Sequence, residues 1–284
     1  MLALLQHYRV VDHQNRVSAA HGPFAYQAQV SFQKHRSVMA VTAGRPPSPL
    51  VSYLSSWMIQ LIETREGVMT DHLNAESSHY PYTAVVEVVA KFPDGTFGQG
   101  SGVMVSANDV LTASHVLWDV DHGGAATSVT IYAGRDGGST PFGAENASQW
   151  FYFQVEDAGH QLTQQQAQYD VGIISLATRE GDQTGWFGMD PNAHSGNYHL
   201  TGYPAVYGPD RMCDDYGYAK EDATYFTFNF DGIESNPGNS GGPLWYQGAN
   251  GPYVVGVCST TDWAADIYKT YDQLLSWIHQ DGIW

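Results

Sequence analysis

From Tyr82 onward, the chain consists largely of short apolar runs separated by glycine, proline, asparagine and aspartate. The first run, 83–91, is rich in valine and is followed by a turn signature at 92–95. Runs at 103–105 and 110–112 flank Asn108 and Asp109, as the strands of a hairpin would. Further runs lie at 129–132, 171–176, 198–202, 225–230, 242–246 and 253–258. Many short strands with such connections predict an all-β sandwich or barrel rather than alternating strands and helices.

Three segments depart from this strand pattern. Apolar residues at 267, 271, 274 and 278 recur at helical spacing and predict a terminal helix over 266–280. The glutamine-rich stretch 161–168 is typical of a polar surface loop. Residues 1–78 hold five of the twelve histidines, a proline-rich break at 45–49 and a helical apolar pattern over 50–62. We therefore expect two parts, an accessory or propeptide-like segment 1–78 and a domain 79–284.

The charge of the chain excludes several classes of function. Twelve basic and 29 acidic residues give a formal charge of −17, which argues against binding to phosphate backbones or anionic lipid. No apolar stretch is long enough to cross a membrane as a helix, and the amino terminus lacks the pattern of a secretory signal. Cys213 and Cys258 are compatible with one bridge or two thiols, and their spacing is not that of metal ligands.

The segment 237–244, with the sequence PGNSGGPL, is the strongest chemical signal in the chain. A serine among glycines lies on a tight turn that a substrate backbone can approach. The amides of Gly238 and Ser240 can point at one spot, as the oxyanion of a tetrahedral intermediate requires. A serine hydroxyl is unreactive alone, so a base must stand beside Ser240, usually a histidine oriented by a carboxylate.

Two further segments supply candidates for that base and that carboxylate. His115 lies in the sequence TASH at 112–115, and Asp170 opens the apolar run DVGIISL at 170–176. An acid at the mouth of a strand is well placed to be half buried against an imidazole. Other candidates for the acid are Asp119, Asp121 and Asp136. Asp119 and Asp121 offer too few ligands for a calcium loop, so no metal is expected.

The three segments, in the order histidine, aspartate, serine, resemble the chymotrypsin-like serine peptidases. The spacings between the three residues are 55 and 70, and the resemblance covers about residues 79–284. It implies two six-stranded-type antiparallel β-barrels with a carboxy-terminal helix, and peptide-bond hydrolysis through His115, Asp170 and Ser240. It also implies an oxyanion hole at Gly238 and Ser240, protein or peptide substrates, no cofactor, a secreted or periplasmic location, a zymogen form and a monomer.

Within that family, the segment TGYP at 201–204 and Asn239 before the serine are similar to the bacterial glutamyl endopeptidase branch. Trypsin-like zymogens have aspartate at that neighbouring position, which pairs with a freed amino terminus. Asn239 cannot form that ion pair, so activation by amino-terminal insertion is not expected. Ser259 resembles the serine that supports the triad carboxylate, and the backbone of Ser259 and Thr260 would pair with an extended substrate.

Two positions bear on residue preference at the cleaved bond. Glutamyl-specific relatives carry a histidine where this chain has Cys258, and a threonine shortly before the serine where it has 235–237, beginning with Ser235. Glu234 falls where trypsin-like members hold the acid that binds lysine or arginine. Either Glu234 gives a preference for basic side chains, or Pro237 and a one-residue shift turn it outward.

Two alternative functions remain at this stage. A periplasmic quality-control protease of the heat-shock type has similar GNSGG and GSGV segments, but that reading expects a following peptide-binding domain. A catalytically inactive homologue that serves as a binding module is the other alternative. Reaction of Ser240 with a fluorophosphonate probe separates an active enzyme from such a module.

Overall fold

The computed structural model describes residues 76–155, 162–208 and 210–281. It also describes the backbone of three short strands before them, β1 (Val10–Asp12), β2 (Val17–Ser18) and β3 (His72–Leu73). The helix predicted over 50–62 lies outside the described residues. In the described part, no helix has the length and hydropathy needed to cross a membrane.

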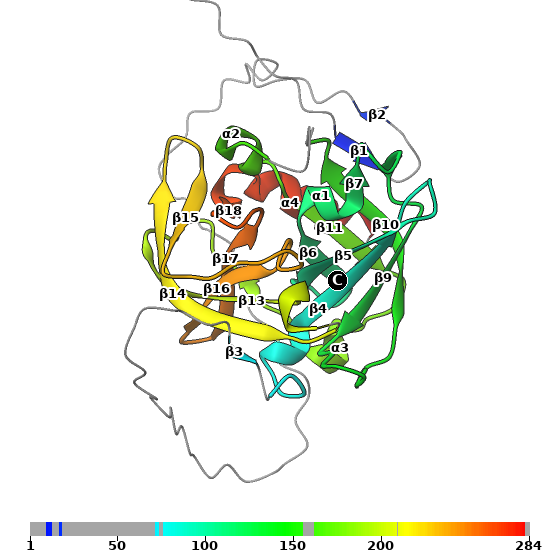
Figure 1. Ribbon diagram of the computed structural model, residues 1–284, viewed down its shortest axis with the longest axis horizontal. Helices are drawn as coiled ribbons and strands as arrows, with labels where there is room; N and C mark the ends of the chain where they lie inside the picture. The colour runs from blue at the N-terminus through cyan, green and yellow to red at the C-terminus, as the bar shows by residue number, and fades with distance from the viewer. Residues whose placement is uncertain are drawn as a thin grey trace, which may run out of the picture.

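The amino-terminal half of the described domain is a closed antiparallel barrel (Figure 1). The sheet closes because β10 pairs with both β9 and β11, while β1 pairs with residues 151–153 of β10. Its six strands are β4 (Val85–Lys91), β5 (Phe97–Met104), β6 (Asp109–Thr112), β9 (Ser128–Ala133), β10 (Glu145–Phe153) and β11 (Gly172–Leu176).

The carboxy-terminal half is a second closed barrel beside the first (Figure 1). Here β17 pairs with both β16 and β18 and closes the sheet. Two short strands attach at its edges, β12 (Gly188–Met189) to β17 and β3 to residues 213–214 of β14. The six barrel strands are β13 (Gly196–Gly202), β14 (Cys213–Asp222), β15 (Thr227–Asp231), β16 (Pro243–Gly248), β17 (Gly251–Cys258) and β18 (Trp263–Asp266).

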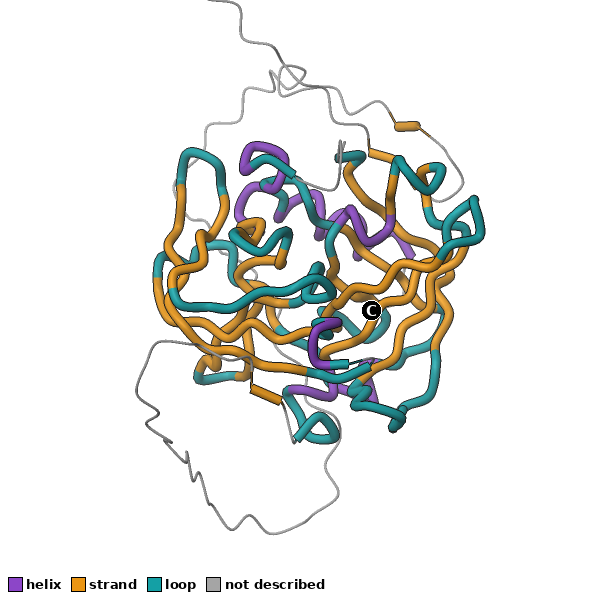
Figure 2. Tube along the Cα trace, in the orientation of Figure 1, coloured by secondary structure: helices purple, strands orange, loops and turns teal. Residues whose placement is uncertain are grey.

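Helical segments are short, and strands make up most of both barrels (Figure 2). The helices are α1 (Ser114–Leu117), α2 (Gln164–Ala167), α3 (Gly181–Thr184) and α4 (Tyr271–Ile278). A two-stranded pair, β7 (Trp118–Asp119) with β8 (Gly124–Ala125), follows α1. Turns of 3₁₀ helix lie at Tyr82–Ala84, Ala205–Tyr207, Ile267–Lys269 and His279–Asp281.

The all-β class and the two-barrel architecture confirm the sequence-based prediction. Two local predictions differ from the structure. The segment predicted as a helix over 266–280 is α4 flanked by two 3₁₀ turns, because Thr270 has a non-helical backbone at ψ 2°. The stretch predicted as a polar loop contains α2, whose start is stabilised by a capping box between Thr163 and Gln166.

One hydrophobic cluster runs through the first barrel and continues into the second. Helix α4 joins it through Trp277, whose ring stacks on Phe151 at 6.0 Å between centroids and packs on Phe153 at 5.0 Å. Cys213 and Cys258 are both buried free thiols, so the structure has the second of the two arrangements that the sequence allowed. The Trp277 contacts pack the carboxy-terminal helix against β10 of the first barrel.

Candidate active site

His115 and Asp170 meet because the strands that precede and follow them are paired. His115 lies on α1 just after β6, Asp170 lies just before β11, and Thr112 of β6 is in register with Gly172 of β11. The imidazole Nδ1 is 2.6 Å from Asp170 Oδ2, and the backbone amide of His115 donates to Oδ1 at 2.9 Å. A carboxylate partner fixes the proton on Nδ1, which leaves Nε2 as an acceptor.

The Asp170 carboxylate is fully buried, with 0% of the residue exposed. Ser259 Oγ donates a third hydrogen bond to Oδ2 at 2.6 Å. Burying a charged carboxylate is costly unless donors surround it, and here three donors do. Ser259 thus has the contact that the sequence resemblance implied for it.

Ser240 lies on a turn of the second barrel, just before β16. Gly238 and Gly241 adopt positive φ angles of +103° and +84°. A Cβ atom on Gly238 would lie 2.3 Å from the Tyr203 carbonyl oxygen, and one on Gly241 would lie 2.2 Å from that of Ser101. Only glycine fits both positions, which explains the glycines that flank the serine.

Hydrogen bonds to the turn's carbonyl groups fix the direction of its amides. The Pro237 carbonyl accepts from the Ala205 amide, and the Asn239 carbonyl accepts from the Gly242 amide, both at 2.8 Å. In a trans peptide the N–H points opposite to the C=O. The amides of Gly238 and Ser240 therefore point away from these partners, and neither donates a hydrogen bond within the part of the chain that the structure describes.

Residues from both barrels line one cleft of about 560 Å³. His115 comes from the first barrel, and Ser240 comes from the second. The residues that line the cleft are His115, Leu162, Ser235, Asn236, Pro237, Ser240, Ser259, Thr260, Thr261, Asp262 and Trp263. The structure thus brings His115 and Ser240 to one cavity, with Asp170 buried behind the imidazole.

The predicted substrate-binding residues divide into two groups. Ser235, Ser259 and Thr260 line the cleft. Cys258 is buried beneath it, with Sγ 3.2 Å from Ser235 Oγ. Glu234 is not among the lining residues, and its carboxylate accepts a hydrogen bond from Asn236 Nδ2 at 3.1 Å.

Several lining residues carry no motif that sequence reasoning could use. Leu162 comes from the connection between β10 and β11, which reaches the second barrel through Gln164. Gln164 Nε2 donates to three oxygens there, on Asp222, Thr227 and Asn229, at distances between 2.8 and 3.3 Å. Asp262 and Trp263 come after the strand β17. Only their proximity in sequence to Ser259 could have indicated that they line the cleft.

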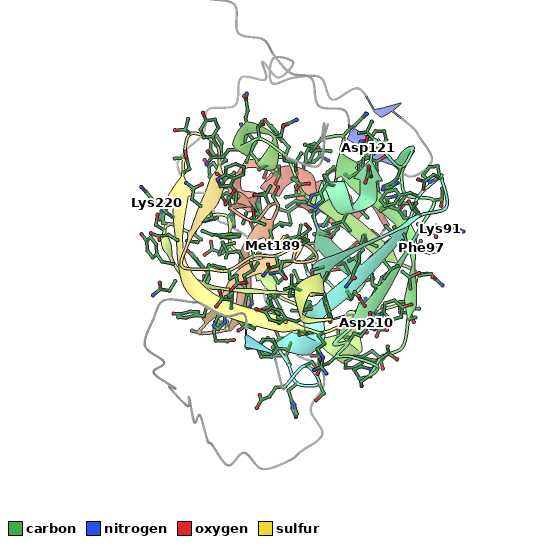
Figure 3. The ribbon with its side chains drawn as sticks, in the orientation of Figure 1. Lys91, Phe97, Asp121, Met189, Asp210 and Lys220 are labelled. Carbon is green, nitrogen blue, oxygen red and sulfur yellow. The ribbon has the colours of Figure 1, made fainter. Side chains whose placement is uncertain are left out.

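Apart from His115, the ionisable side chain that lines this cleft is acidic. Asp262 is exposed and is the carboxylate among the lining residues, while none of the described lysines or arginines lines the cleft. Lys91 and Lys220 lie at opposite outer edges of the molecule, and the Lys91 ammonium lies 5.7 Å from the centre of the Phe97 ring (Figure 3).

Two of the other candidate acids have partners elsewhere. Asp119 contacts His122, and Asp136 lies in a turn closed by Ser139. In the described residues, no group of three or more histidine, cysteine or carboxylate side chains is arranged to hold a metal.

Two closed barrels, with a histidine and an aspartate on one and a serine turn on the other, define the chymotrypsin-like fold class. The trypsin family model matches residues 70–278. The chain belongs to the trypsin family, which confirms the family predicted from its motifs.

Two characterised relatives are similar in sequence. An extracellular metalloprotease of Bacillus subtilis is 31% identical over 153 residues, which are 51% of this chain and 47% of that protein. A glutamyl endopeptidase of Bacillus licheniformis is 24% identical over 215 residues, covering 70% of this chain and 64% of that protein. The chain thus spans about half the length of the first relative and somewhat under two thirds of the second.

Solved structures share the fold at low sequence identity. A glutamyl endopeptidase is 18% identical with a TM-score of 0.59, and the match covers 75% of this chain and 97% of that one. Protease Anisep from Arthrobacter nicotinovorans is 20% identical with a TM-score of 0.56, covering 68% and 96% of the two chains.

Proposed function

We propose that this chain is a serine endopeptidase whose catalytic residues are His115, Asp170 and Ser240. The observation that carries the proposal is the 2.6 Å contact between His115 Nδ1 and the buried Asp170, in a cleft shared with Ser240. Nucleophilic catalysis by serine needs this combination of a hydroxyl, a base and a group that orients the base. Membership of the trypsin family supports it independently.

The proposed reaction has two stages. Ser240 Oγ attacks the scissile carbonyl carbon while His115 Nε2 takes the hydroxyl proton, and the oxyanion accepts hydrogen bonds from the Gly238 and Ser240 amides. His115 then gives the proton to the leaving amine, the C–N bond breaks, and an acyl ester remains on Ser240. Water attacks that ester with His115 again as base, which releases the acid and restores the hydroxyl. Asp170 holds the imidazole tautomer and stabilises its cation throughout.

Labelling with a fluorophosphonate tests the proposal directly. We expect the purified chain to be labelled at Ser240 and to cleave peptides from a library, and Ser240→Ala to lose both reactions. Ser148→Ala, which removes an exposed serine on β10, is the matched control and retains both. A wild-type chain that stays unlabelled both uncut and after cleavage between about 71 and 79 would instead favour the inactive binding homologue.

Residues 1–78 are proposed to be a removable, propeptide-like segment that acts sterically. The proline-rich break at 45–49 supports this proposal. The pairing of β3 with β14 and of β1 with β10, and a family match that begins at residue 70, favour the alternative that the segment is an integral part of the fold. Cutting the folded protein between about 71 and 79, removing the fragment and assaying a small peptide should raise activity. Unchanged activity, with the fragment bound until the barrels unfold, would make the segment an integral part of the fold.

The remaining expectations concern the setting of the enzyme. We propose that it acts outside the cytoplasm, as a monomer, on proteins or peptides. One relative is named as extracellular, and the formal charge of −17 disfavours nucleic acids as partners. Fractionation of the producing cells and sedimentation of the purified chain test these statements.

A further inference from the structure

Ser101 is a fully buried residue of the first barrel that contacts the catalytic turn of the second. It lies on β5 with 0% of its surface exposed. Its amide donates to the Ser240 carbonyl at 2.7 Å, and its hydroxyl donates to the Gly238 carbonyl at 2.7 Å. The hydroxyl also accepts from the Tyr203 amide at 2.8 Å. One side chain therefore ties together three segments that are distant in sequence.

These contacts matter because Gly238 has no side chain to fix its own orientation. Its peptide groups are held on both sides, by Ala205 at the Pro237 carbonyl and by Ser101 at the Gly238 carbonyl. With both neighbouring peptide planes fixed, the Gly238 N–H keeps one direction. The Ser101 hydroxyl also contacts the segment that holds the Pro237 carbonyl. Its other partner, Tyr203, lies two residues before Ala205, whose amide donates to that carbonyl.

The side chain of Asn239 gives the turn no comparable support. Asn239 is 2% exposed, and its Oδ1 accepts no hydrogen bond within the described residues. The position of the turn thus depends on backbone groups and on Ser101 rather than on an ion pair at residue 239.

We propose that Ser101 is a positioning residue for the oxyanion-binding amides, so that the first barrel orients the catalytic turn of the second in the uncut chain. This inference rests on the serine endopeptidase function proposed above. Ser101 touches neither substrate nor the reacting atoms and acts through Gly238. We therefore expect loss of its hydroxyl to affect stabilisation of the transition state more than substrate binding.

The test compares Ser101→Ala with Ser175→Ala in the uncut full-length chain. Ser175 is the matched control, because it is also fully buried in the first barrel and its hydroxyl donates to Asp109 at 2.7 Å. We expect Ser101→Ala to lower kcat about 10-fold, less than loss of a direct oxyanion donor, with KM changed less than about 2-fold. A peptide aldehyde, which forms an oxyanion on Ser240, should bind correspondingly more weakly. Ser175→Ala should keep the wild-type kcat per folded molecule.

Ser101→Cys serves if the alanine variant does not fold, because a thiol keeps some volume but is a poorer donor. Its kcat should fall below that of the wild type, with KM again little changed. Equal kcat losses in the Ser101 and Ser175 variants, or a change confined to KM, would overturn the role of Ser101. A wild-type chain that does not react with fluorophosphonate, either uncut or after cleavage between about 71 and 79, would instead overturn the endopeptidase function itself.

Discussion

The proposed catalytic residues of the cleft come from both barrels, whereas the proposed substrate wall, residues 260–262, lies in the connection between two strands of the second barrel alone. Asp170 on the catalytic side is fully buried and accepts three hydrogen bonds. Asp262 on the substrate wall is exposed, and the contacts described for it are those of its backbone. We therefore expect the positions of the proposed catalytic residues to depend on contacts between the barrels, and the substrate wall to depend on one connection within the second barrel.

Replacing Asp170 by asparagine tests the catalytic side most severely. The variant keeps the shape of the side chain but places the wrong tautomer on His115, so kcat should fall roughly 10⁴-fold. Steady-state peptide hydrolysis measures the effect, and Asp136→Asn is the matched control among the other candidate acids. An active Asp170→Asn enzyme together with an inactive Asp136→Asn enzyme would move the acid's role to the first-barrel turn.

Gly241→Ala tests how tightly the catalytic turn is enclosed. The new Cβ would lie 2.2 Å from the Ser101 carbonyl oxygen and 2.3 Å from Thr112 Oγ1, so the free energy of unfolding should fall by about 3–5 kcal/mol. Gly137→Ala isolates the backbone contribution, because Gly137 also has positive φ but no atom within 4 Å of its Cβ position. That control should lose about 1 kcal/mol in urea unfolding. Equal losses would mean that the turn can move away.

Asp266 is the last residue of β18, the strand that follows the substrate wall. Its buried carboxylate should make the free energy of unfolding depend on pH. Burial raises its pKa from the ordinary 3.8 to about 7. A raised folded pKa stabilises the protein below the unfolded pKa, and this contribution is lost as the pH rises through about 7. At pH 8, the free energy of unfolding of Asp266→Asn should therefore exceed that of the wild type by on the order of 2–4 kcal/mol, and the variant should unfold at a higher temperature. At pH 4, the two proteins should unfold at similar temperatures.

Thermal unfolding across this pH range checks the prediction. Asp231→Asn, which changes an exposed carboxylate on the neighbouring strand β15, should leave the pH dependence as it is. If Asp266→Asn had no effect at pH 8, the charged form would be well accommodated at this position.

Asp262→Asn should have the smallest effect. A carboxylate on the cleft, with no described lysine or arginine lining it, favours substrates with basic over acidic side chains. Because Asp262 is exposed, its removal should change the ratio of kcat/KM for lysine and glutamate peptides only about 3-fold, and less at high salt. Glu234→Gln is the companion variant. A larger change in that variant would support the sequence-based assignment of the specificity acid to Glu234.

The sequence predicted the parts of this protein that local chemistry determines. Short apolar runs predicted β4, β9 and β11, because strand formation there follows from apolar side chains along a single segment. The three motifs singled out His115, Asp170 and Ser240 as catalytic candidates, because each lies in a short signature. The polar strand β14, by contrast, has the sequence CDDYGYAKED and gave no strand signal. It is a strand because β13 and β15 supply its hydrogen-bond partners.

Tertiary structure alone decided which residues share the cleft. Ser101 and Gly238 are 137 positions apart, and no property of either segment predicts that the hydroxyl of one holds the carbonyl of the other. The same holds for Leu162 and Asp262, which line the cleft without a motif, and for Glu234, which falls at the expected position but outside the lining. The physical reason is that motifs specify the backbone conformation and reactive groups of a segment. The packing of two closed barrels then selects the side chains that meet between them.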